Sequence, residues 1–265
     1  MHVADTKFDS DDKSLLLIKC RRTHTVWDDQ LFITVGISDF ERIRELDYYY
    51  VDKTGLIKTL LRGEMDQVTL ITRPRRFGKT MAMSMLNSFL DIRKDSRELF
   101  EGLEISKETA ICERWMNQYP TLFLSFKDVD GTTFENAFNF LKFIISEACK
   151  QHVYLLDSDE IDEGDKLVFQ KLKTCSASMM EIQSCILRIT NMLKSYYKKP
   201  VILLIDEYDV PIAKASSNGY YKEMLEIMKG LLSTALKDNS SLKFAVITGC
   251  LKIAKESIFT GTNNF

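Results

Sequence analysis

The chain has 265 residues, of which 45% are apolar and 28% are charged, and its 36 lysines and arginines nearly balance 38 aspartates and glutamates. This length suits one large domain or two small ones, and the apolar content is sufficient for a sizeable core, which excludes an intrinsically disordered chain. The formal net charge of −2 excludes a global basic field for a nucleic-acid backbone, so any contact with nucleic acid would be local.

The chain divides into an atypical N-terminal extension, residues 1–35, and a domain from residue 36 to residue 265. The extension shows no clear periodic pattern, whereas the domain alternates apolar strand signals with amphipathic helix signals. We predict strands at residues 68–72, 121–126, 201–205 and 242–248, and helices at residues 79–92, 133–149, 179–197 and 220–236. The acidic residues 157–165 are interpreted as a solvated loop.

Repeated strand and helix units predict an α/β fold, with a mostly parallel sheet covered by helices on both faces. Ligands of such sheets bind beyond the carboxyl ends of the strands. The chemistry of this chain is therefore expected in the segments that directly follow its strands.

Six cysteines and three histidines are scattered along the chain without a CxxC pair. This spacing shows neither a zinc site nor a disulfide framework, and we expect free thiols in a reducing compartment. No segment reaches the roughly 20 apolar residues of a membrane-spanning helix, and the apolar run at residues 15–18 is too short for a signal peptide. We therefore expect a cytoplasmic protein without membrane contact.

The sequence RPRRFGKT, residues 73–80, connects the first predicted strand to the first predicted helix. Backbone N–H groups at the start of a helix bind anions, and the helix dipole favours negative charge there. In this context Lys79 reaches the β and γ phosphates of a nucleotide, and the Thr80 hydroxyl is placed to ligate Mg²⁺. Arg73 stands where the pattern GxxxxGK[ST] has glycine, which leaves open a different loop entry or no phosphate loop at all.

The apolar run VILLI, residues 201–205, ends in Asp206 and Glu207. An aspartate at the end of such a strand holds the Mg²⁺ shell of a nucleotide site, and Glu207 is placed to take a proton from the attacking water as a general base. The alternative is a buried strand that ends in a solvated acidic turn. In the last predicted strand, Thr248 is a candidate for a hydrogen bond to the attacking water or the γ-phosphate, or a plain turn residue.

With these residues in place, the chain resembles the AAA-ATPase-like proteins of bacteria, which are relatives of the archaeal ATPases of the STAND group. The resemblance covers residues 36–265 and includes the Walker A loop and the Walker B strand. It rests on the runs ISDF (37–40), YYYVDKT (48–54), TRPRRFGKT (72–80), LSFKD (124–128), DEYD (206–209), TGCL (248–251) and AKESIFTG (254–261).

The resemblance implies a P-loop NTPase of the additional-strand, AAA-like type that binds ATP with Mg²⁺. Since the family pattern itself carries RPRRFGKT, the resemblance implies that arginine in the glycine position, here Arg73, is common to the family. The implied catalytic residues are Glu207 and Lys79, to which we add Thr248, and the implied metal ligands are Thr80 and Asp206. The candidate nucleotide-binding residues are Pro74, Arg75, Arg76, Phe77, Gly78, Lys79, Thr80 and Met81 in the loop, with Tyr50, Asp52 and Lys53 on the adenine side.

Two features depart from the family pattern. Lys252 stands where relatives usually have arginine, and an ammonium does not replace the fixed fork of a guanidinium. Relatives also continue into a nuclease-like domain of the PD-(D/E)XK type, so we expect this domain to be truncated at its C-terminal end and to lack that region.

Other residues near the predicted site have two interpretations. The three loop arginines, Arg73, Arg75 and Arg76, either contact phosphate or a neighbouring subunit, or form a solvated turn paired with acids. The tyrosines at 48–50 either stack on a base or, as three consecutive aromatic residues of an extended segment, place one ring in the core and two along the surface. The methionines of the following helix are expected to fill gaps in the core.

We expect an ATP-binding P-loop NTPase, an ATP hydrolase that couples Mg²⁺-dependent turnover to a conformational change. The alternative is a nucleotide-binding switch or scaffold with little turnover. A small-molecule kinase would need an arginine-rich lid, and the sequence shows none. The expected partners are the nucleotide and, through the loop arginines, another subunit. The sequence does not identify a protein or DNA client.

Overall fold

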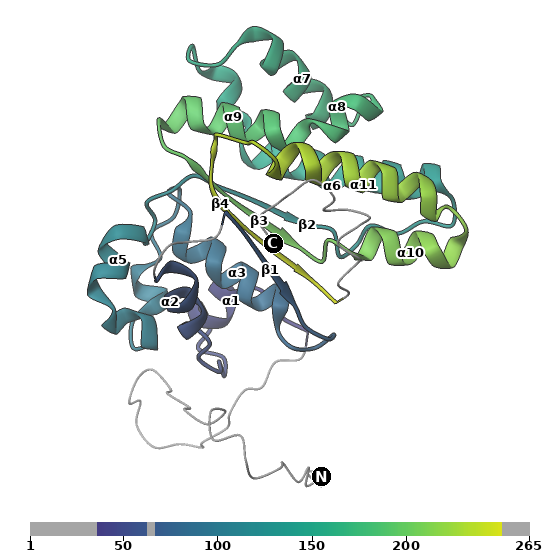
Figure 1. Ribbon diagram of the computed structural model, residues 1–265. Coiled ribbons are helices and arrows are strands. Elements are labelled where there is room, and N and C mark those ends of the chain that lie inside the picture. The colour runs from purple at the N-terminus through teal and green to yellow at the C-terminus, as the bar shows by residue number, and fades with distance from the viewer. Residues whose placement is uncertain (1–35, 63–66, 251–265) are drawn as a thin grey trace, which may run out of the picture.

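A computed structural model describes residues 36–62 and 67–250. Its centre is a sheet of four parallel strands in the order β1-β4-β3-β2 (Figure 1). The strands are β1 (Val68–Thr72), β2 (Thr121–Ser125), β3 (Val201–Asp206) and β4 (Leu242–Gly249). Since β4 lies between β1 and β3, the sheet has the additional-strand arrangement that was predicted.

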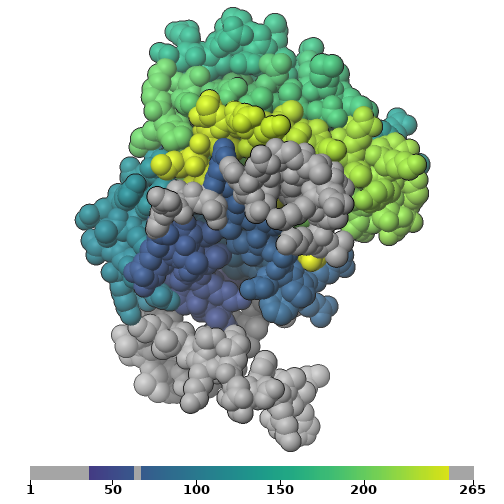
Figure 2. All heavy atoms as spheres, in the orientation of Figure 1, coloured from purple at the N-terminus to yellow at the C-terminus, as the bar shows by residue number. Residues whose placement is uncertain are grey.

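Helices cover both faces of this sheet (Figure 1). One layer contains α1 (Phe40–Glu45), α2 (Gly55–Leu61), α3 (Lys79–Leu90), α4 (Arg97–Phe100), the 3-10 helix η1 (Glu104–Lys107) and α5 (Thr109–Trp115). The other contains α6 (Phe134–Gln151), the 3-10 helix η2 (Val153–Asp157), α7 (Glu163–Lys173), α8 (Met179–Gln183), α9 (Cys185–Tyr197), α10 (Val210–Asn218) and α11 (Tyr221–Leu236). Figure 2 shows the same division on the surface, with the early chain (purple to blue) on one side and the later chain (green to yellow) on the other.

The strands separate two hydrophobic cores because successive side chains of a strand point to opposite faces. In β3, which is buried along its whole length, Leu203 and Ile205 join one core while Ile202 and Leu204 join the other. Leu86 of α3 lies in the second of these cores. The sheet is therefore covered on both faces, as the continuous apolar runs of the sequence indicated.

The strand predictions are confirmed to within a residue or two, whereas two predictions around the later helices are wrong. The helix expected over residues 179–197 is divided at Ser184, whose hydroxyl donates a hydrogen bond back to Met180 O at 3.1 Å and competes with the helical pattern. The acidic loop ends early because Asp162 caps α7, accepting hydrogen bonds from two backbone N–H groups. Acidic side chains at 163 and 165 then suit the positive end of the helix dipole.

Several expectations from the sequence can be compared directly with the structure. Cys112, Cys149 and Cys185 are free and buried, and Met83 and Met85 of α3 are fully buried in the core, as expected. Within the described ranges, no helix has the length and apolar character needed to cross a bilayer. The extension at residues 1–35, Lys252 and the run at residues 254–261 lie outside the described residues.

Candidate functional site

The loop between β1 and α3 has a left-handed backbone at two positions. The angle φ is 72° at Arg76 and 76° at Gly78, the residue that precedes α3. No described side chain caps α3, so no side chain occupies the N–H groups of its first turn, which are the groups that bind anions at helix N-termini. A Cβ atom at Gly78 would lie 3.4 Å from Lys53 Nζ. Glycine therefore serves both the backbone turn and the close approach of a second lysine.

The Lys79 ammonium lies where the loop, the end of β3 and the end of β4 meet. Its Nζ lies 3.2 Å from Glu207 Oε1 and donates hydrogen bonds to Cys250 Sγ at 3.2 Å and Pro74 O at 3.3 Å. Burial by itself lowers the pKa of Lys79, but the hydrogen bonds to Cys250 and Glu207 and the charge of Glu207 together outweigh it, so the pKa is raised. The structure thus holds a charged ammonium against the predicted general base.

Asp206 is fully buried at the carboxyl end of β3 and has a hydrogen bond to each oxygen. The Thr248 hydroxyl donates to Asp206 Oδ1 at 2.6 Å, and the Ser125 hydroxyl donates to Oδ2 at 3.2 Å. Ser125 and Asp206 are register partners across β2 and β3. Neighbouring strands on both sides therefore fix this carboxylate.

Glu207 adopts a left-handed backbone, with φ at 55°, which is unfavourable for a residue other than glycine. Its N–H donates to Thr248 Oγ1 at 3.3 Å, so one threonine hydroxyl binds both members of the acidic pair. The exposed fraction of the Glu207 side chain is 15%. The strained turn and this hydrogen bond hold Glu207 where its carboxylate meets Lys79.

Four residues at the site, Tyr208, Asp209, Gly249 and Cys250, were not among the predicted site residues. Asp209 is buried, and its Oδ2 accepts a hydrogen bond from Cys250 N at 3.0 Å. A Cβ atom at Gly249 would lie 2.6 Å from Asp209 Oδ1 and 2.6 Å from Tyr208 Cε1. The acidic turn after β3 therefore packs directly on the end of β4, and only glycine fits at position 249. Their place in the runs DEYD and TGCL is the one sequence signal for these residues.

The remaining loop residues surround the lysine. Thr80 and Met81 follow Lys79 in the first turn of α3, and both are half-buried. Pro74, Arg75, Arg76 and Phe77 are exposed. Within the described ranges, the side chains of Arg73, Arg75 and Arg76 form no ion pair, so the alternative of a basic turn paired with acids is not observed there.

The candidates on the adenine side have structural contacts of their own. The Tyr50 hydroxyl donates to Met85 Sδ at 3.3 Å, and the Tyr50 ring packs edge-on against Phe40. Asp52 accepts hydrogen bonds from Thr54 and from Glu104 N, which ties this segment to η1. These contacts explain why the segment is ordered beside the loop, and a role at the adenine remains a prediction.

The oxygen donors at the site suit a small hard cation. Asp206 supplies a carboxylate and Thr80 a hydroxyl, and Mg²⁺ in proteins is usually held by one or two carboxylates, water and substrate phosphates. Within the described residues, no group of three or more His, Cys, Asp or Glu side chains forms a cage for a metal. One carboxylate and one hydroxyl would suit a Mg²⁺ ion whose other ligands are water and substrate phosphates.

Comparison with known proteins points to one family. The profile of a family described as "Predicted AAA-ATPase" matches residues 34–259. The chain is 28% identical over 234 residues to an uncharacterized protein encoded in the vnfD 5' region of Azotobacter chroococcum mcd 1, an alignment that covers 88% of this chain. The chain spans 40% of the length of that relative. No solved structure matches the chain.

The family profile includes every element of the site, from the Tyr50 segment to the residues after β4. The chain belongs to the AAA-ATPase-like family.

Proposed function

We propose that this domain binds ATP with Mg²⁺ and hydrolyses it, and that turnover is coupled to a conformational change. The observation that carries the proposal is the contact between Lys79 Nζ and Glu207 Oε1 at 3.2 Å. It joins the loop after β1 to the acidic turn after β3, which are 128 residues apart in the sequence (207 − 79 = 128). The family membership supports a nucleotide as the ligand.

Binding is assigned to the start of α3 and to Lys79. The N–H groups of the first helical turn donate to phosphate oxygens. Lys79 supplies a positive charge, because its pKa is raised although the side chain is buried. Asp206 and Thr80 hold Mg²⁺, which neutralises phosphate charge when bound. Ser125 and Thr248 keep the Asp206 carboxylate in place through its two oxygens.

Hydrolysis is assigned to Glu207. The oxygen of a water attacks the γ-phosphorus, Glu207 accepts the proton of that water, and the bond between the γ-phosphorus and the bridging oxygen breaks, which releases ADP and phosphate. Phosphate oxygens compete with Glu207 for Lys79, so nucleotide binding frees the carboxylate for this role. Thr248 then acts as a positioning residue, because its single proton is donated to Asp206.

One observation favours the second candidate, a nucleotide-binding switch with little turnover. Glu207 is paired with Lys79, so a general base is available only when this ion pair opens. If the pair persists with nucleotide bound, the domain binds ATP and hardly hydrolyses it.

Mg²⁺-dependent ATP binding and phosphate release, measured on the same samples, test the proposal. Lys79→Ala should abolish binding, and Glu207→Gln should retain binding but lose turnover by about 100-fold or more, the usual range of a general base. Glu147→Gln, which removes the charge of a carboxylate in a peripheral helix ion pair, is the matched control and should match wild type. Turnover that survives Glu207→Gln would contradict the assignment of the base, and binding without release by wild type would support the switch.

A further inference from the structure

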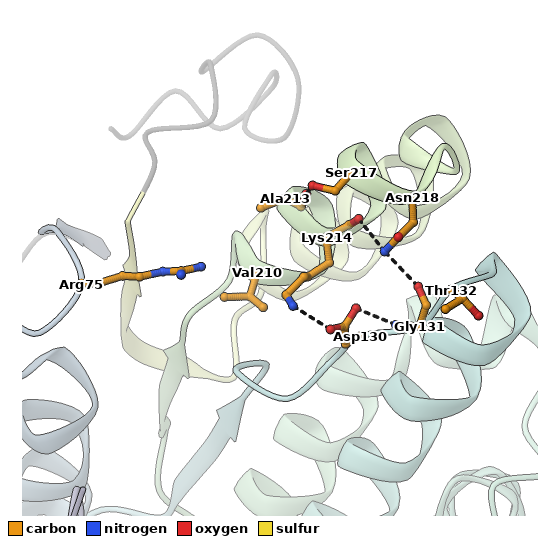
Figure 3. A pocket seen from close by; sticks show the side chains of 9 residues that line it. All are labelled: Arg75, Asp130, Gly131, Thr132, Val210, Ala213, Lys214, Ser217 and Asn218. Atoms are coloured by element: carbon orange, nitrogen blue, oxygen red, sulfur yellow. Dashed lines mark hydrogen bonds and ion pairs between the residues drawn. The ribbon is translucent and has the colours of Figure 1, made fainter. Parts of the chain in front are cut away.

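A hollow opens at the same edge of the sheet, beside α10. Its volume is about 680 Å³, and its walls come from the phosphate loop, the turn after β2 and α10 (Figure 3). Arg75 of the loop points toward α10 from one side, while Val210 and Lys214 lie on the other (Figure 3). The pocket lies beside the Lys79 site, because Val210 begins α10 only three residues after Glu207.

The wall opposite Arg75 is connected by an ion pair and hydrogen bonds. Lys214 Nζ lies 2.6 Å from Asp130 Oδ2, and Asn218 Nδ2 donates to Gly131 O at 3.1 Å (Figure 3). The Tyr220 hydroxyl donates to the same carbonyl at 2.6 Å. Three contacts therefore connect the turn after β2 to α10 and to the start of α11 on this side of the pocket.

Among the described residues, the charges of the pocket leave one cation, Arg75, without a partner. The hydrogen bond from Lys214 lowers the pKa of Asp130, so these two charges balance each other. Across residues 36–62 and 67–250, no hydrogen bond or ion pair engages the Arg75 side chain. A carboxylate or phosphate is the natural partner for a guanidinium, which offers a planar fork of donors.

The mixed lining favours a polypeptide over a nucleic acid. Because Lys214 is paired with Asp130, the pocket offers no second cation to the successive phosphates of a polyanionic backbone, whereas a peptide with one carboxylate among neutral groups needs only Arg75. Val210 and Ala213 add an apolar surface for a neighbouring side chain, and Ser217 adds a hydroxyl. The pocket is open on one side, which suits an inserted segment of chain more than an enclosed small molecule.

We propose that this pocket binds an acidic segment of a partner polypeptide, with one carboxylate of the segment paired to Arg75. The binding itself does not depend on the proposed ATPase function, and only its coupling to nucleotide rests on that function. Arg75 belongs to the phosphate loop, so a carboxylate on its guanidinium competes with phosphate for the same charge. The segment and ATP should therefore weaken each other's binding by the same factor, as linkage requires.

The test uses a fluorescein-labelled peptide that carries one glutamate among leucine, alanine and serine residues, with fluorescence anisotropy as the measurement and no nucleotide present. Arg75→Gln should weaken binding about tenfold or more, as loss of a charge-assisted pair does. Arg76→Gln is the matched control, because Arg76 is an exposed arginine of the same loop that does not line the pocket. Ser217→Trp fills the pocket from α10 without changing the loop, and it should weaken binding by a similar factor.

Each alternative has its own outcome. Equal losses for Arg75→Gln and Arg76→Gln, with no effect of Ser217→Trp, would overturn the proposal in favour of a diffuse basic surface. Stronger binding of labelled oligo-dT than of the peptide, with the same dependence on Arg75, would overturn it in favour of nucleic acid. Absence of peptide binding by wild type would overturn it whether or not ATP binds. Thermal unfolding of each variant tests whether the domain is still folded.

The coupling is tested separately by repeating the peptide titration with saturating Mg²⁺-ATP. Wild type should bind the peptide more weakly with ATP, and Lys79→Ala should bind it equally well with and without ATP. If peptide binding depends on Arg75 but its affinity is the same with and without ATP, the peptide site is supported and its coupling to the nucleotide is overturned. A chain that binds the peptide but no ATP would contradict the proposed function alone.

Discussion

Replacing Thr248 by valine removes one hydroxyl at the carboxyl ends of β3 and β4 and leaves the side-chain shape almost unchanged. That hydroxyl donates to Asp206 Oδ1 at 2.6 Å and accepts from Glu207 N at 3.3 Å. Thr248 and Asp206 are both buried, so water does not easily replace the hydroxyl. A hydrogen bond to a charged group contributes about 1.5 to 3 kcal/mol and a neutral one about 0.5 to 1.5 kcal/mol. The free energy of unfolding should therefore fall by about 2 to 4.5 kcal/mol.

Urea unfolding followed by circular dichroism measures this change. Thr248→Ser keeps the hydroxyl and should recover most of the loss. Thr190→Val is a matched control, because the Thr190 hydroxyl is also buried but contacts only two neutral groups, Leu187 O and the Asn239 amide. Its cost should be about 1 to 3 kcal/mol. If Thr248→Val unfolds within about 0.5 kcal/mol of wild type, the range of a neutral surface change, the hydroxyl does not hold the acidic pair and the reasoning fails.

Two further predictions concern packing and pH. Gly249→Ala should lower the free energy of unfolding by about 1 to 3 kcal/mol or more, because its methyl would lie 2.6 Å from the buried Tyr208 ring. Gly55→Ala is the control: its methyl would meet a flexible carboxylate, that of Glu104, at 3.3 Å, so the free energy of unfolding should hardly change in the same assay. Burial, and to a smaller extent the charge of Arg93, lower the pKa of His152 to about 3, so the unfolded chain binds a proton below about pH 6.5 that the folded chain does not. Stability from this group is complete above pH 6.5 and falls by about 1.4 kcal/mol per unit below it, and His152→Gln should flatten the unfolding free energy between pH 6.5 and 5. An unchanged slope in that variant would show that other groups set the pH dependence.

The strands and the principal motifs were predictable because each depends on local sequence. A β-branched apolar run bounded by polar residues indicates a buried strand wherever it occurs, and a GKT tripeptide after such a run indicates a phosphate loop. The positions of Lys79, Asp206 and Glu207 at one edge of the sheet then follow from parallel topology, since the carboxyl ends of parallel strands meet. The structure shows this proximity, since Lys79 Nζ lies 3.2 Å from Glu207 Oε1.

The contacts that fix these residues were not predictable, because they depend on register between distant strands. Ser125 meets Asp206 only because the two residues are paired across β2 and β3, 81 positions apart. Asp209 reaches Cys250 N only because the turn after β3 bends over the end of β4. The helix break at Ser184 was missed for another reason, since a helical pattern of apolar residues continues across it.

The order of the strands explains how one lysine reaches the acid of a strand that is not its neighbour. Adjacent strands lie about 4.8 Å apart, so β1 and β3, with β4 between them, are separated by about 10 Å. The loop that leaves β1 and the turn that leaves β3 can therefore meet only across the end of β4. The residue at that point is Cys250, and Lys79 Nζ contacts both its sulfur and Glu207 at 3.2 Å. A small side chain after β4 is thus a condition for the site, because a bulkier one would occupy the space through which Lys79 extends.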